Sequence, residues 1–332
     1  IGNGEVVEGP VDLSDGKFNS WTEKVAAVKG KVCNTYWVVS AVENRFYAYQ
    51  VNNIAVSKTP TISIVPNSAS RRGYLKISPD GTKIAIANQN SNFNNSVFLY
   101  DFNNETGEVS KTSTKLIDGV SGTGQAYGVE FSSDSKKLYV SNTSGFRATI
   151  FNPIAYPAET YKLFQFDLES SDIRLSRELI HQQIGNSTDY PQGGFRGALQ
   201  LGPDGKIYAT IPFAYNDGFA PFLDAIENPT ANAADIIFTK NAIDLNGKFA
   251  TQGLPPFIAS LLLPIKILDD SSGLQTNNED LKTCIGSTKI IKPEAISGIT
   301  NLNYIWTFDN GTIKTIISNS STQTSLNLTN IQ

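Results

Sequence analysis

The chain has 332 residues with one histidine, two cysteines and a formal net charge of −4. A mildly acidic chain without a basic stripe argues against a nucleic-acid partner, and the absence of any run of eighteen apolar residues argues against a membrane-spanning helix. A single histidine excludes a zinc site built from several histidines. Charged residues make up only 17% of the chain, a composition that suits an extracellular β protein.

Four short segments of alternating apolar residues open the chain between residues 23 and 65: EKVAAVKG, TYWVVSAV, RFYAYQV and TISIV. A period of two residues predicts strands with one buried face. The next four predicted strands begin with YLKISPDGTKIAIAN at 74–88 and continue through VFLYDF to Ile117. A third set begins with VEFSSDSKKLYVSN at 129–142, and a fourth with LQLGPDGKIYATIP at 199–212.

Three of these sets share a hairpin corner that contains an aspartate, at Asp80, Asp134 and Asp204. An aspartate side chain can accept hydrogen bonds from nearby backbone N–H groups, and the following glycine tolerates a positive φ. Because the three aspartates occupy the same corner of separate repeats, we interpret them as turn residues and not as metal ligands.

Four-stranded units repeated without intervening helices are typical of a β-propeller. The predicted fold class is therefore all-β, with the propeller at 1–267. The first residues read as the outer strand of an earlier blade, which favours a larger propeller that is incomplete at its N-terminus; a closed propeller of four or five blades is the alternative. A polar linker at 268–280 separates the propeller from a further module at 281–332, predicted to be a truncated β-sandwich.

The order of these blocks resembles the propeller region, with PD40 or TolB-like repeats, of large surface proteins that gliding bacteria export by type IX secretion. The resemblance covers roughly residues 1–267. It implies a propeller of seven blades when complete, a secreted protein at the outer cell surface and contact with the type IX secretion machinery. In the second module, YIWTFDNGT is similar to a strand of PKD modules, and Cys284 with Trp306 resembles the Cys and Trp of Ig-like domains. Any partner of Cys284 would then lie beyond Gln332, and Cys33 reads as a buried thiol.

Candidate binding residues lie in two insertions between predicted strands, at 145–161 and 212–229. Aromatic and arginine side chains are favoured at interfaces; the alternative is that these rings pack against their own blade. The candidates are Phe146, Arg147, Phe151, Tyr156, Tyr215 and Asp217. Asp217, Asp224 and Glu227 also suggest a calcium site with oxygen ligands, although a polar connection between strands explains them as well. No other cofactor is expected.

No catalytic set is evident, because His181 has no nucleophile motif beside it and reads as an exposed loop residue. The sequence therefore favours a non-catalytic surface module, not an enzyme, whose loops contact a protein or a glycan. The alternative is a propeller enzyme of the lactonase, hydrolase or lyase kind that uses carboxylates and a cation at the central channel.

Overall fold

The computed structural model describes residues 21–32, 34–89, 95–118, 124–144, 160–184, 196–211, 220–261, 289–291, 304–309, 314–319 and 326–328. Two compact units divide the chain, residues 1–263 and residues 264–332. Within the described ranges the helices are two 3₁₀ turns, η2 (Ala233–Asp235) and η3 (Ala259–Leu261). Neither is long or apolar enough to cross a membrane.

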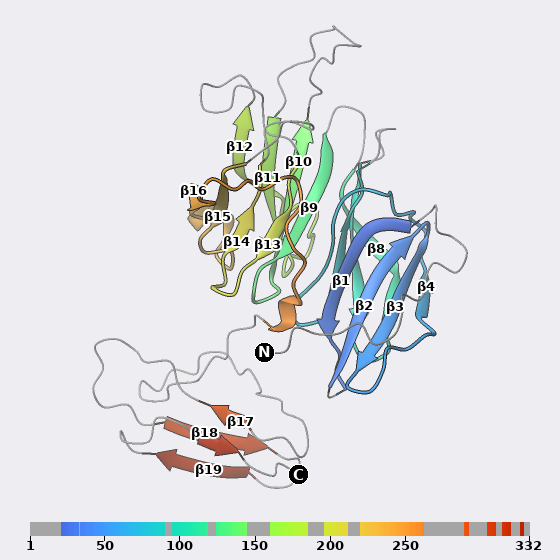
Figure 1. The fold of residues 1–332 in the computed structure, drawn as a ribbon, viewed down its shortest axis with the longest axis vertical. Coiled ribbons are helices and arrows are strands. Elements are labelled where there is room, and N and C mark those ends of the chain that lie inside the picture. The colour runs from blue at the N-terminus through green and yellow to red at the C-terminus, as the bar shows by residue number, and fades with distance from the viewer. Residues whose placement is uncertain are drawn as a thin grey trace, which may run out of the picture. The chain divides into compact units, whose positions relative to one another are not determined.

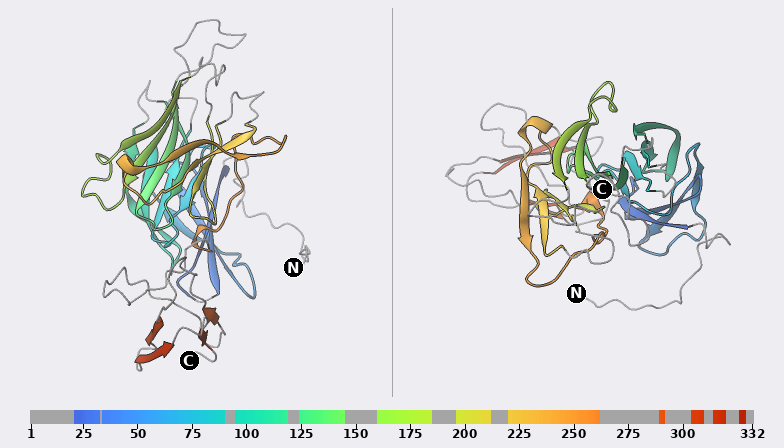
Figure 2. Two further views of the ribbon diagram at one scale, coloured as in Figure 1. Left: turned by 90° about the vertical axis from the view of Figure 1, so that its left-hand side faces the viewer. Right: turned by 90° about the horizontal axis from the view of Figure 1, so that it is seen from above.

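The first unit confirms the prediction of an all-β propeller. Its described strands form four antiparallel sheets of four strands, which fan out about a shared centre when seen from above (Figures 1 and 2). Blade 1 is β1 (Trp21–Lys29), β2 (Thr35–Val42), β3 (Arg45–Asn52) and β4 (Thr61–Ile64). Blade 2 is β5 (Leu75–Ile77), β6 (Lys83–Ala87), β7 (Val97–Asn103) and β8 (Glu108–Ile117). Blade 3 is β9 (Gln125–Phe131), β10 (Lys137–Ser144), β11 (Thr160–Asp167) and β12 (Glu178–Ile184). Blade 4 is β13 (Leu199–Leu201), β14 (Ile207–Ala209), β15 (Phe222–Ile226) and β16 (Phe238–Asp244).

The blades pack face to face, because both faces of a middle blade carry apolar residues. Trp37 and Phe46 of blade 1 meet Ile84 and Tyr100 of blade 2 in one buried cluster. Two further clusters join blade 2 to blade 3 and blade 3 to blade 4. The first strands β1, β5, β9 and β13 contact one another in succession, so they are innermost and surround the axis.

A closing segment, residues 250–261, runs from blade 4 back to blades 2 and 1. The Gln252 carbonyl accepts from the Ala198 N–H at 2.9 Å, and the Leu254 N–H donates to the Tyr74 hydroxyl at 2.9 Å. Further on, the Ser260 hydroxyl accepts from the Lys29 N–H at 2.9 Å. The segment therefore ties the last described blade to the first.

The aspartate corners are turns, as predicted. The N–H two residues after each aspartate donates to its carboxylate, at 3.0 Å for Asp80, 3.2 Å for Asp134 and 3.3 Å for Asp204. The residue that follows each aspartate has a positive φ, 73° at Gly81, 62° at Ser135 and 78° at Gly205. The shared sequence phrase thus encodes one corner geometry.

Gly205 is a suitable position for measuring the cost of the positive φ, because no atom lies within 4 Å of a Cβ added there. Gly205→Ala should therefore lower the free energy of unfolding by about 1 kcal/mol through the positive φ alone. Gly81→Ala should lower it further, because its Cβ would lie 2.5 Å from the Asn104 amide nitrogen. Urea denaturation of both variants measures this, and a Gly205→Ala protein as stable as the wild type would contradict the strain argument.

The second unit is described through four strands, β17 (Lys289–Ile291), β18 (Tyr304–Asp309), β19 (Lys314–Asn319) and β20 (Leu326–Leu328). β17 pairs with β20, and β18 pairs with β19 as an antiparallel hairpin. The Asn310-Gly311 pair between β18 and β19 is a sequence that predicts a hairpin turn. The linker at 268–280 and both cysteines lie outside the described residues.

Candidate functional site

Polar and aromatic side chains gather where the innermost strands begin. Glu23 lies in β1, Tyr74 directly precedes β5, Tyr127 lies in β9 and Arg196 precedes β13. We call these four residues the axial mouth. No sequence motif identifies these residues, because they come from four blades. They also lie at different numbers of residues from the corner aspartates of their blades.

The axial mouth is built by direct contacts across neighbouring blades. The Tyr74 N–H donates to the Tyr127 carbonyl at 2.9 Å, and the two rings meet edge to face with centroids 5.5 Å apart. The Arg196 guanidinium lies 5.5 Å from the centroid of the Tyr127 ring, close enough for a cation–π interaction. The Tyr127 ring of blade 3 therefore lies between the Tyr74 ring, which precedes β5 of blade 2, and the Arg196 guanidinium, which precedes β13 of blade 4.

Glu23 is the exposed member of the axial mouth. Its Oε1 accepts from the Gly73 N–H at 2.9 Å, which fixes the carboxylate at the blade 1–blade 2 boundary. Burial and then the negative charge of Glu23 raise the pKa of Tyr127, so this phenol stays protonated at neutral pH. The site thus presents a carboxylate to solvent beside a protonated phenol.

Two glutamine side chains hold Arg196 in place. Its Nε donates to Gln252 Oε1 at 2.6 Å, and one terminal nitrogen donates to Gln89 Oε1. Gln89 Nε2 in turn donates to Gln125 Oε1. Arg196 is 4% exposed, so its positive charge is positioned in surroundings of low dielectric where electrostatic effects are strong.

Two residues further along the chain from Tyr74, Lys76 joins Glu130 and Gln200 in an axial cluster. Lys76 Nζ donates to Glu130 Oε2 and to Gln200 Oε1, both at 2.7 Å. Glu130 also accepts from the N–H groups of Phe131 and Leu201, both at 3.0 Å. All three side chains are buried and hydrogen-bonded, so this cluster is a structural connection between blades 2, 3 and 4.

The predicted binding residues Phe146, Arg147, Phe151, Tyr156, Tyr215 and Asp217 all lie outside the described residues. Tyr161, at the end of the first insertion, is fully buried in β11. Of the calcium candidates, Asp224 is buried in β15 and accepts from the Asn241 N–H at 2.8 Å, whereas Glu227 pairs with Lys206 at 2.7 Å. In the part of the chain that the structure describes, no three acidic, histidine or cysteine side chains come together as metal ligands.

The prediction of an exposed loop for His181 is wrong. The fourth strand of blade 3 begins at Glu178 and includes His181, whose ring stacks on Phe238 with centroids 4.1 Å apart. Burial and then the nearby Lys240 lower the pKa of His181 to about 4. The imidazole is therefore neutral at physiological pH.

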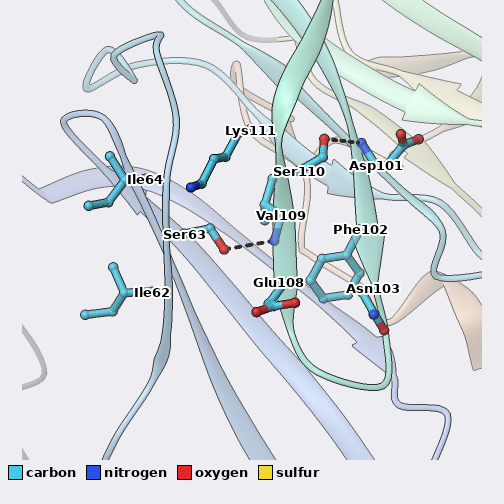
Figure 3. A pocket seen from close by; sticks show the side chains of 10 residues that line it. All are labelled: Ile62, Ser63, Ile64, Asp101, Phe102, Asn103, Glu108, Val109, Ser110 and Lys111. Atoms are coloured by element: carbon cyan, nitrogen blue, oxygen red, sulfur yellow. Dashed lines mark hydrogen bonds between the residues drawn. The ribbon is translucent and has the colours of Figure 1, made fainter.

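An open groove of about 590 Å³ lies between β4 and the hairpin of β7 and β8 (Figure 3). Ile62 and Ile64 flank Ser63, whose hydroxyl accepts from the Val109 N–H at 2.9 Å. The groove lies at the outer rim of the blades. Of its two acidic residues, Asp101 is paired with Lys83 at 3.0 Å and Glu108 accepts a hydrogen bond from the Thr106 hydroxyl at 3.2 Å.

No protein-family model and no curated protein sequence matches the chain. Among solved structures, it is similar to a Bacteroides uniformis protein assigned as a 6-phosphogluconolactonase, with 12% identity and a TM-score of 0.39 over 66% of this chain and 55% of that one. It is also similar to a periplasmic gluconolactonase of Pseudomonas aeruginosa, with 11% identity and a TM-score of 0.35 over 92% and 88%. A third is the propeller domain of the trilobed protease of Pyrococcus furiosus, with 15% identity and a TM-score of 0.29 over 61% and 54%.

These likenesses concern the propeller fold, and the chain spans about half the length of the Bacteroides protein. They also correct one prediction. The interpretation as a non-catalytic module, not an enzyme, is contradicted, because several of the similar propellers are named as lactonases. The findings favour the alternative, a propeller enzyme.

Proposed function

We propose that the propeller is a hydrolase that opens a sugar lactone at the axial mouth. The observation that carries this proposal is the exposed Glu23 carboxylate, fixed by the Gly73 N–H and set beside Tyr127, whose ring in turn lies against Arg196. A carboxylate general base and a positioned positive charge are two groups that accelerate ester hydrolysis, by activating water and by stabilising the oxyanion. The lactone as substrate class follows the names of the gluconolactonases to which the fold is similar.

In the proposed reaction, Glu23 accepts a proton from a water molecule whose oxygen attacks the lactone carbonyl carbon. The carbonyl oxygen becomes an oxyanion, which the positive charge of Arg196 stabilises. The bond between that carbon and the ring oxygen then breaks, and the ring oxygen receives the proton from Glu23. The product is the open-chain hydroxy acid. The proposed scheme uses no metal ion and no other cofactor.

Glu23→Gln is the test, because it keeps the side-chain shape and removes the base. With D-glucono-1,5-lactone as the probe, we expect kcat/KM to fall by roughly 100-fold or more, measured as acid release after subtraction of spontaneous hydrolysis. Glu105→Ala is the matched control, since Glu105 is an exposed glutamate paired with Lys31. Wild-type protein that does not accelerate acid release would overturn the proposal, and an unaffected Glu23→Gln enzyme would exclude Glu23 as the base.

We further propose that the protein is exported to the outer cell surface by type IX secretion. The support is the resemblance of its ordered blocks to surface proteins of gliding bacteria, and the PKD or Ig-like character of the second unit belongs to the same proposal. Fractionation of cells with an antibody against the propeller tests this location.

A further inference from the structure

The outermost strand of blade 1, β4, has an unpaired edge. Among the strands that the structure describes, β4 pairs with β3 alone. Just after β4, the Val65 N–H donates to the Asn44 carbonyl at 2.9 Å and continues the same antiparallel register. Because the hydrogen bonds of an antiparallel ladder alternate along each strand, the N–H and C=O groups of Ile62 and Ile64 point away from β3. These backbone groups can pair with a further strand.

The side chains of β4 give this edge an apolar side and a polar side. Ile62 and Ile64 are 48% and 54% exposed and point to one side of the strand, whereas Ser63 points to the other side, toward β8 (Figure 3). Charges, prolines or bulges within an edge strand usually prevent pairing with another chain. β4 contains none of the three. The edge is therefore open to strand addition next to two exposed isoleucines.

The groove of about 590 Å³ lies along the polar side of β4, and its volume falls within the range of ligand sites. Buried Phe102 and Val109 contribute to its lining. The ladder of β7 and β8 is irregular here, because Phe102 pairs with Val109 but Tyr100 pairs with Ser113, so that one residue of β7 faces three of β8. A bulge of this kind redirects side chains. Figure 3 shows Lys111, which belongs to the bulge, extending from β8 toward β4.

Two charged side chains of opposite sign mark the ends of the groove. Glu108 lies at the end where β4 begins, and Lys111 lies at the end where β4 finishes (Figure 3). Both are exposed, and Lys111 makes no ion pair with a residue that the structure describes. The third charged residue of the groove, Asp101, is already paired with a lysine at 3.0 Å. A complementary occupant therefore carries a negative group near Lys111 and a positive group near Glu108.

We propose that the edge of β4 binds an extended peptide of a partner protein, which adds an antiparallel strand to blade 1 along the groove. Backbone hydrogen bonds with Ile62 and Ile64 hold the peptide. Its residues opposite these two are apolar and contact the isoleucines, and the alternate residues point into the groove. In the antiparallel direction an acidic residue comes first, at Lys111, and a basic residue comes last, at Glu108. This surface is separate from the axial mouth and does not depend on the proposed hydrolysis.

Binding of the acetylated and amidated pentapeptide EVTVK to the intact protein tests the proposal by ligand-detected NMR. We expect a Kd of about 1 mM or tighter, the range of a weak but specific contact. The same peptide with both valines N-methylated cannot donate hydrogen bonds to Ile62 and Ile64, so its Kd should be roughly 10-fold weaker or more. Lys111→Glu should weaken the binding of EVTVK by roughly 3- to 10-fold, because two like charges then meet.

The double variant Glu108→Lys with Lys111→Glu exchanges the two charges, so it should prefer the pentapeptide KVTVE, whereas the wild type prefers EVTVK. Ile64→Asp should weaken binding by roughly 10-fold. Ile243→Asp is the matched control and should bind as the wild type does, because Ile243 is an exposed isoleucine on β16, the outer strand of blade 4. Glu23→Gln should also leave Kd unchanged. The proposal is overturned by no binding of EVTVK, by equal Kd values for the N-methylated peptide, or by equal effects of Ile64→Asp and Ile243→Asp.

Discussion

Glu130→Ala is expected to lower the free energy of unfolding by about 3–5 kcal/mol, the range for removing one partner of a buried ion pair. The Lys76 ammonium would remain buried and lose its counter-charge, since the side chain of Lys76 is 8% exposed and that of Glu130 is fully buried. The backbone N–H groups of Phe131 and Leu201 would lose their acceptor as well. The loss should appear in urea denaturation as a lower midpoint with an unchanged slope.

The exposed pair of Lys31 and Glu105 provides the control, because its N–O distance of 2.7 Å equals that of Lys76 and Glu130. Glu105→Ala should cost at most about 1 kcal/mol, since water screens a surface pair. The double variant Lys76→Met with Glu130→Leu should recover most of the stability that Glu130→Ala loses, because no charge stays buried. Equal losses for Glu130→Ala and Glu105→Ala would show that burial does not control the energetics of the axial cluster.

The axial cluster could have been predicted from the repeat. Lys76, Glu130 and Gln200 each stand four residues before the corner aspartate of their blade, and each is a polar residue between two apolar ones in an innermost strand. In a propeller, equivalent positions of innermost strands face one axis, so a cation, an anion and an amide at this position are expected to meet. The repeat therefore predicts both the propeller fold and the contact between the three side chains of the axial cluster.

The axial mouth could not be predicted in the same way. Arg196 reaches Tyr127 only through the packing of blade 4 beside blade 3, and the closing segment brings Gln252 to Arg196 from 56 residues away. The error at His181 has a local cause. The alternating segment IRLSRELI predicts the outer strand of blade 3 at 173–180, whereas the strand begins at Glu178 and includes His181.

In the proposed hydrolase, the axial cluster contributes to stability and the axial mouth contributes to catalysis. The axial cluster is buried and fully hydrogen-bonded, so it holds three blades in one register and leaves no group for a substrate. The axial mouth lies above it and contains an exposed carboxylate. Tyr74 joins the two levels, since Lys76 Nζ lies 5.6 Å from the centroid of its ring. In the proposed reaction, this buried cluster beside the exposed Glu23 would keep the reacting groups in position.

Lys24 should make the stability of the protein rise between pH 7 and pH 9. This side chain is 1% exposed, and its ammonium donates to the Ser70 and Arg72 carbonyls at 2.8 and 2.6 Å. Burial lowers the pKa of Lys24 to about 7, although the charge of Glu23 opposes the shift. The unfolded chain keeps a pKa near 10.5 and therefore binds more protons than the folded chain above pH 7. The free energy of unfolding should thus increase by about 2 kcal/mol over these two pH units.

Lys24→Met isolates this contribution, because it removes the titrating amine and keeps an unbranched apolar stem. Urea denaturation at pH 7, 8 and 9 should show the rise in the wild type and a smaller rise in the variant. Measurements stop at pH 9 because buried tyrosines such as Tyr127 have raised pKa values and would oppose the trend at higher pH. If Lys24→Met does not fold, NMR titration of the lysine side-chain signals in the wild type replaces it. Parallel stability profiles, or no lysine signal that titrates near pH 7, would mean that the Lys24 amine stays charged in the folded protein.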